Sequence, residues 1–130
     1  MERQKEAILN SVTHVVKCVF PNTTNHYDTL FGGTALQWMD EVAFITATRF
    51  SRQRMVTVSS EKVDFKKPIP SGTFAELIGK VTMVGTSSLK IRVDIYIEHM
   101  HKNHRELAVS GEFIMVCIDE HKNAVPIQLA

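Results

Sequence analysis

The chain has 130 residues, of which 44% are hydrophobic and 22% are charged, so it has the size and composition of one globular domain. A formal net charge of +1 excludes the broad basic surface that dominates nucleic-acid binding, and no apolar run approaches the roughly 18 residues of a membrane span. We therefore expect a single domain over residues 1–130, with neither nucleic acid nor membrane as a partner.

The N-terminal residues and the cysteines indicate a cellular compartment. The first ten residues, MERQKEAILN, lack the apolar segment of a signal peptide. Cys18 and Cys117 lie far apart in apolar, strand-like stretches, which favours buried thiols over a disulfide framework. Both observations predict a cytoplasmic location.

The first half of the chain predicts a strand, a loop and a long helix. Residues Asn10–Phe20 are rich in valine and end before Pro21, which indicates a strand. The segment NTTNHYDTLFGG contains turn-forming residues and predicts a loop. From about Thr34 to Arg49 the sequence predicts a helix, because apolar residues recur every three or four positions, at Ala35, Leu36, Met39, Val42, Ala43, Ala47 and Phe50.

The second half of the chain predicts strands. Four segments are rich in β-branched residues and are separated by turns, namely MVTVSSEKVDF, FAELIGKVTMV, SLKIRVDIYIEHM and ELAVSGEFIMVCI. One long helix followed by a meander of four strands predicts an α+β fold, in which an antiparallel sheet wraps around the central helix.

The predicted helix carries two features of chemical interest. Asp40 projects to the flank of the apolar face, and a carboxylate that is buried there needs a partner and often has a functional role. The alternative is a carboxylate at the rim that simply reaches water. Gly32 and Gly33 at the helix entry allow a ligand to approach free N–H groups, although a diglycine is equally able to form a plain tight turn.

A longer pattern connects these features. Asn25, then Leu30-Phe31-Gly32-Gly33, then Met39-Asp40 resembles the signature of hotdog-fold acyl-CoA thioesterases in its joint spacing. The similarity extends from about Val12 to Pro126, through VTVSSEKVDFKKPIPSG, VGTSSLKIRVDIY and EFIMVCIDEHKNAVP. Within the family, the chain looks most similar to bacterial acyl-CoA hydrolases of broad specificity and to the domains of animal cytosolic enzymes.

The resemblance implies a function and a mechanism. The chain is expected to hydrolyse fatty acyl-CoA to a free fatty acid and CoA, with Asp40 as general base or nucleophile and Asn25 orienting the water or the thioester. N–H groups around Gly32 and Gly33 are expected to polarise the thioester carbonyl. No cofactor is expected, because CoA is part of the substrate and the product.

The resemblance also implies an assembly. We expect a homodimer, with a hexamer formed as a trimer of dimers as a further possibility. Each active site is expected to lie across the dimer interface, with Asn25 of one subunit facing Asp40 of the other.

Two further groups of residues are candidates for substrate binding. Ser59 and Glu61 alternate on one strand face, which is either a wall of the site or only a half-exposed strand. Ser87 and Ser88, with Lys90 beyond them, are suited to bind the CoA phosphates through hydroxyl, N–H and ammonium groups, but they also suit an ordinary turn.

A metal site and two other functions are alternatives. His99, His101 and His104 lie close together in sequence, but no acidic or thiol partner is evident and the resembled family works without a metal, so we expect none. An acyl-thioester dehydratase of the same fold would need a histidine where Asp40 stands. A non-catalytic acyl-CoA-binding module would normally carry a DNA-binding segment. The thioesterase is therefore favoured.

Overall fold

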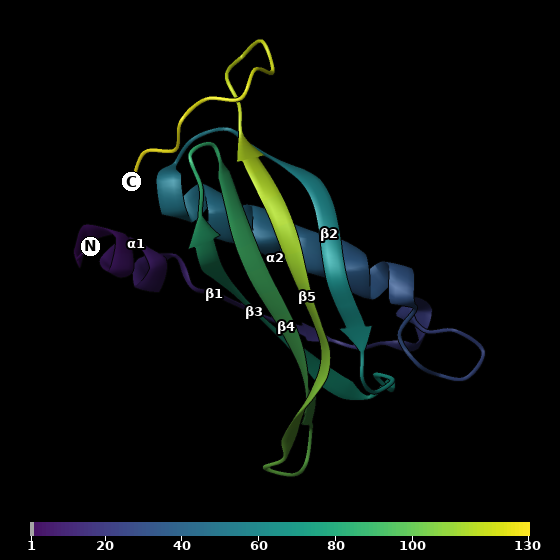
Figure 1. Cartoon of the computed structure of the whole chain (residues 1–130). Helices are drawn as coiled ribbons and strands as arrows, with labels where there is room; N and C mark the ends of the chain where they lie inside the picture. The colour runs from purple at the N-terminus through teal and green to yellow at the C-terminus, as the bar shows by residue number, and fades with distance from the viewer. Residues whose placement is uncertain (1) are drawn as a thin grey trace.

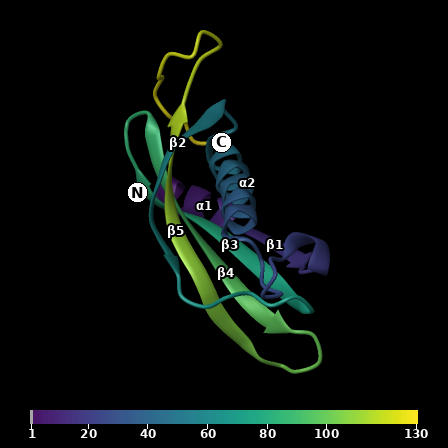
Figure 2. The ribbon, with the colours of Figure 1, turned by 90° about the vertical axis from the view of Figure 1, so that its right-hand side faces the viewer.

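The computed structural model describes residues 2–130 as one antiparallel sheet with two helices. The sheet order is β1-β3-β4-β5-β2, and the long helix α2 lies against one face of the curved sheet (Figures 1 and 2). The α+β prediction is therefore confirmed. The elements are α1 (Glu2–Ser11), β1 (Thr13–Cys18), the short 3₁₀ helix η1 (Pro21–Thr23), α2 (Gly32–Ser51), β2 (Met55–Phe65), β3 (Thr73–Val84), β4 (Ser88–His99) and β5 (Arg105–Cys117).

Three details of the prediction are wrong, namely the start of the first strand, the number of helices and the order of the later strands. The predicted first strand, Asn10–Phe20, begins too early, because helix α1 continues to Ser11. Helix α1 contains Glu, Gln, Lys, Ala, Ile and Leu, which favour a helix, so α2 is one of two helices rather than the only one. The four later strands do not form a simple meander either, because β2 pairs with β5 and the chain then crosses to β3.

The core lies between α2 and the concave face of the sheet. Alternate residues of β3 and β4 are buried there, as expected for strands with one covered face. The helix contributes fully buried side chains, including Met39 and Phe50. Burial of a large apolar side chain of this kind typically contributes about 1.5–3 kcal/mol, so the helix and the sheet stabilise each other.

Helix α2 packs tightly against the sheet at Gly79 of β3. A Cβ atom at this position would overlap with Oγ1 of Thr46 and would lie 2.8 Å from Cγ1 of Val42. The Thr46 hydroxyl is held in place, because it donates a hydrogen bond to the Val42 carbonyl at 2.8 Å. The absence of a side chain at Gly79 therefore sets the spacing between helix and sheet.

The cysteine prediction is half correct. Cys117 is buried, and burial raises the pKa of its thiol. Cys18 is exposed, because β1 is an edge strand whose alternate residues face outward. Both thiols are free. Within residues 2–130, neither helix has the length and apolar character needed to cross a membrane.

The contact at Gly79 generates a stability prediction. Gly79→Ala should lower the free energy of unfolding by about 1–3 kcal/mol, because the added methyl group overpacks the contact with α2. Gly33→Ala is the matched control for stability, since a Cβ atom there would have no neighbour within 4 Å. Urea unfolding followed by circular dichroism measures both. Equal stability of the two variants would contradict the close-packing account.

Candidate active site

A groove of about 510 Å³ opens between α2 and the edge strand β2. One wall comes from the N-terminal half of α2 and the other from β2, with a phenylalanine of β5 at the base. The lining residues are Gly33, Leu36, Gln37, Asp40, Thr57, Val58, Ser59, Ser60 and Phe113. The structure thus brings together three predicted site residues from two elements, namely Gly33, Asp40 and Ser59.

Asp40 lies at the edge of the groove and is held by one strong hydrogen bond. The Thr57 hydroxyl donates to Oδ1 of Asp40 over 2.7 Å, and its oxygen also lies 3.2 Å from the Met115 sulfur. Asp40 is exposed in the single chain. The alternative prediction, a carboxylate at the rim of the apolar face that reaches water, is therefore correct for the single chain. One carboxylate oxygen is fixed in position while the other remains available at the groove.

Thr57 is a further candidate site residue, which the sequence patterns did not predict. It lies on the α2 side of the sheet, because it pairs with the buried Met115 of β5. No local pattern distinguishes it from the neighbouring polar residues of β2. Its contact with Asp40 follows from the packing of β2 against α2.

The first turn of α2 borders the same groove through Gly33. The helix begins at Gly32, two residues earlier than predicted, and the preceding Phe31 offers no side-chain acceptor to cap it. The N–H groups of the first turn lack partners within the helix and carry partial positive charge. Gly33 lines the groove, so a carbonyl oxygen there can approach these donors closely.

Asn25 does not line the groove of its own chain. Its Oδ1 atom organises the loop before α2, accepting hydrogen bonds from the Tyr27 N–H at 2.9 Å, the Thr29 N–H at 3.3 Å and the Thr29 hydroxyl at 3.1 Å. Its Nδ2 donates to no group within residues 2–130. A single chain therefore does not join Asn25 to Asp40, and the amide remains available as a donor.

Ser59 and Glu61 share a strand face, as predicted, but it is the outer face. A bulge at Val58 shifts the register, so that Ser59 pairs with Ile114, which in turn pairs with Lys90 on the outer side of β4. Ser59 reaches the groove at its rim. Glu61 lies outside the groove and forms an ion pair with Lys90 at 3.4 Å.

Ser87 lies in the turn between β3 and β4, and Ser88 and Lys90 lie at the start of β4, apart from the groove lining. Ser88 and Lys90 line a separate hollow of about 110 Å³ with Gly85. The Ser87 carbonyl accepts a hydrogen bond from the Cys117 N–H at 2.8 Å, so this turn also anchors the end of β5. The single chain does not bring these residues to Asp40.

The chain matches a known family over more than half of its length. Residues 27–103 match the thioesterase superfamily model. An uncharacterized acyl-CoA thioester hydrolase of Bacillus subtilis, YkhA, is 40% identical over 109 residues, which cover 84% of this chain and 63% of the relative. The chain thus spans less than two thirds of that relative's length.

Solved structures share the fold. An acyl-CoA hydrolase from Staphylococcus aureus, characterized in complex with butyryl-CoA, CoA and CoA disulfide, superposes with a TM-score of 0.89 at 34% identity and covers 94% of this chain and 74% of its own. A hexameric acyl-CoA thioesterase superposes with a TM-score of 0.90 at 33% identity, over 94% and 78% of the two chains. The predicted hotdog fold is confirmed by these structures. The S. aureus enzyme has also been solved with alanine in place of a threonine, an aspartate and an asparagine.

Proposed function

The chain belongs to the thioesterase superfamily, and from that premise we propose that it hydrolyses acyl-CoA thioesters to a free fatty acid and CoA. One observation carries the proposal: a single groove joins the Asp40 carboxylate, the Thr57 hydroxyl and the N-terminus of α2. A carboxylate that activates water and donors aimed at a carbonyl oxygen are the parts that acyl transfer to water requires.

The comparison with the S. aureus enzyme supports the choice of residues. The asparagine, aspartate and threonine replaced in its variants are separated along that chain by the same intervals as Asn25, Asp40 and Thr57. Asn25 and Asp40 belong to the sequence pattern that resembles the family, and Thr57 donates a hydrogen bond to Asp40.

The proposed reaction proceeds by attack of water on the thioester carbonyl. Asp40 accepts a proton from the water, the new C–O bond forms, and the C–S bond then breaks, with the CoA thiolate taking the proton back from Asp40. N–H groups at Gly32 and Gly33 stabilise the oxyanion between these steps, a role in which one donor typically contributes about 2.7–4 kcal/mol. Direct attack by Asp40, giving a mixed anhydride that water hydrolyses, uses the same groups. CoA enters and leaves as substrate and product, so the reaction uses no further cofactor.

The substrate is proposed to extend over the outer surface of the sheet. Ser59 lies at the groove rim, and the Glu61–Lys90 ion pair follows on the outer face. Lys90 is placed to exchange its pairing with Glu61 for a CoA phosphate, because a phosphate offers more negative charge than a carboxylate. Ser87 and Ser88, at the start of the same strand, are the proposed hydroxyl and N–H donors.

The active unit is proposed to contain two copies of the chain. Strand β2 is the edge of the sheet next to the groove, and its unpaired backbone groups can pair with a second β2. Its exposed apolar residues are Val56, Val58 and Phe65. Such a pairing would bring Asn25 of one copy to Asp40 of the other. The solved hexamer of a similar thioesterase supports assembly, with a trimer of dimers as the proposed larger form.

The two other functions have less support. A dehydratase of this fold would need a histidine at the position of Asp40, and a binding module would not need an aspartate fixed by Thr57 beside a free helix end. A cytoplasmic location remains part of the proposal, supported by the two free cysteine thiols.

Asp40→Asn should lower kcat for acyl-CoA hydrolysis by at least about 100-fold, because it removes the base and preserves the shape. The assay follows release of free thiol from acyl-CoAs between acetyl-CoA and palmitoyl-CoA. Glu41→Gln is the matched control, since Glu41 is an exposed carboxylate on the same helix and should leave kcat unchanged. Near-normal turnover by Asp40→Asn would show that Asp40 is only a rim residue.

Thr57→Val should lower kcat by roughly tenfold with little change in KM, because a hydrogen bond to a charged group contributes about 1.5–3 kcal/mol. Valine keeps the shape of threonine and removes the hydroxyl. Thr57→Ser keeps the hydroxyl and should restore most of kcat. If the valine variant matched the wild type, or serine failed to rescue it, Thr57 would not act by positioning Asp40.

A further inference from the structure

A cluster of metal-binding side chains lies at the end of the β4–β5 hairpin, outside the groove described above. Donor atoms of His99, His104 and Glu106 lie within 4.8 Å of one another. The two imidazole rings have their centroids 5.2 Å apart, and Nε2 of His104 is 3.8 Å from Oε2 of Glu106. The sequence predicts no metal site at these histidines, because no acidic partner is evident in it. In the fold, Glu106 is such a partner.

The pairing of the strands explains why these three side chains meet. Glu106 pairs with Ile97, whose side chain is buried on the α2 side of the sheet. His104 is two residues before Glu106 and His99 is two residues after Ile97, so all three side chains face that side. The hairpin is closed by the hydrogen bond from the His99 N–H to the His104 carbonyl at 3.1 Å.

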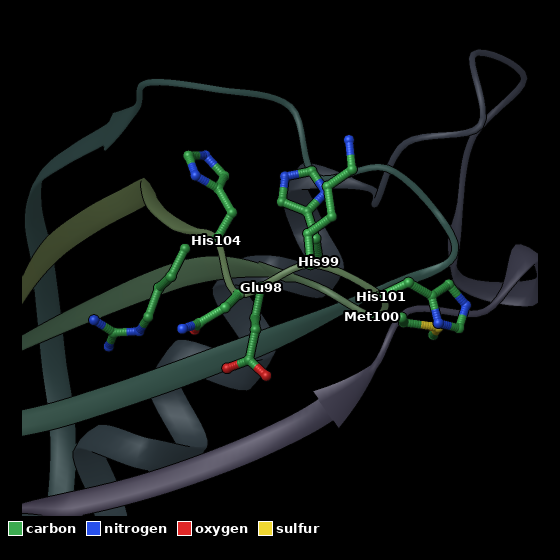
Figure 3. A pocket seen from close by; sticks show the side chains of 8 residues that line it. Glu98, His99, Met100, His101 and His104 are labelled. Carbon is green, nitrogen blue, oxygen red and sulfur yellow. The ribbon is translucent and has the colours of Figure 1, made fainter.

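The neighbouring side chains point elsewhere. Figure 3 shows the His99 and His104 rings on one side of the hairpin, Glu98 on the other, and His101 directed away at the tip. These residues border a hollow of about 390 Å³ that is open to solvent. An ion can therefore reach the cluster and keep water ligands in its open positions.

The donor set selects a class of metal. Two imidazole nitrogens and one carboxylate oxygen suit Zn²⁺, Ni²⁺, Co²⁺ and Cu²⁺ rather than Mg²⁺ or Ca²⁺, which prefer oxygen ligands. Donors around one zinc ion lie roughly 3–4 Å apart, given bond lengths of about 2.0–2.2 Å. Small side-chain rotations are enough to close the present spacing, because His104 is exposed and His99 and Glu106 are only half-buried.

Lys67 competes with a metal ion for the Glu106 carboxylate. Its ammonium group lies 2.9 Å from Oε2 of Glu106. The hydrogen bond from Lys67 is the largest cause that lowers the pKa of Glu106. A divalent ion bound to Glu106 must displace the ammonium group of Lys67, because the two positive charges repel each other. Lys67 therefore lowers the affinity of the cluster for metal ions.

We propose that His99, His104 and Glu106 form a divalent transition-metal site, with Zn²⁺ or Ni²⁺ as suitable ions, in competition with Lys67 for Glu106. The site lies outside the proposed reaction and supplies no group to it. Lys67 also borders an apolar hollow with Leu30 and Phe65, which is separate from the groove.

The test is calorimetric titration of the untagged full chain with Zn²⁺ and, separately, with Ni²⁺. We expect saturable binding of one ion per chain. His99→Ala and His104→Ala should each weaken binding by at least about tenfold, and Glu106→Gln should act similarly while keeping the side-chain shape. His101→Ala is the matched control and should leave the affinity unchanged. Lys67→Met should strengthen binding severalfold.

Three results would overturn the proposal. They are the absence of saturable binding to the wild type, a loss in His101→Ala as large as that in His99→Ala, and an unchanged or weaker affinity in Lys67→Met. The last measurement tests the part played by Glu106, because removing Lys67 frees the Glu106 carboxylate and also removes a positive charge beside it. Circular dichroism of each variant confirms that the hairpin changes leave the fold intact.

Discussion

Burial of α2 against the concave face of the sheet is the constraint on which the rest of the structure depends. The helix packs closely against β3 because Gly79 carries no side chain where Val42 and Thr46 of α2 approach. With Met39 directed into the core, Asp40 must lie at the flank of the helix, facing β2. The same rotation of the helix places the first turn of α2 at the groove. The positions of the proposed base and the proposed oxyanion donors therefore follow from hydrophobic packing, and the hydrogen bond from Thr57 adds the final orientation of the carboxylate.

The groove is open because its second wall is an edge strand. Water can reach Asp40 from the side of β2, and the free amide of Asn25 lies on a loop outside the groove. An exposed carboxylate is a weak catalytic base unless its surroundings are more enclosed, since exclusion of water strengthens every electrostatic interaction in a site. A second chain at β2 would enclose the groove and supply the missing donor. In this account catalysis depends on association, because the second chain both excludes water from the groove and supplies the Asn25 amide.

Sequence patterns predicted the parts of the fold that depend on local chemistry. All four later strands and the long helix were located within a few residues, because β-branched runs, turn residues and helical periodicity are local signals. The pairing of β2 with β5 was missed, because pairing of distant strands leaves no local trace. The outward direction of Ser59 and Glu61 depends on the bulge at Val58, and the contact of Glu106 with two histidines depends on the register of β4 with β5. Asn25 and Asp40 could be predicted from the resemblance to the family. Thr57 could not, because its contact with Asp40 depends on how β2 packs against α2.

The central claim is that each active site takes Asp40 from one chain and Asn25 from another, and subunit mixing tests it most directly. Chains carrying only Asn25→Ala are mixed with chains carrying only Asp40→Asn, under conditions in which sedimentation and mass-tagged subunits prove exchange. The account predicts partial recovery of acyl-CoA hydrolysis, because each mixed dimer contains one site free of both changes. No recovery despite proven exchange would contradict the shared site, and hydrolysis by a species of monomer mass would contradict the requirement for two chains.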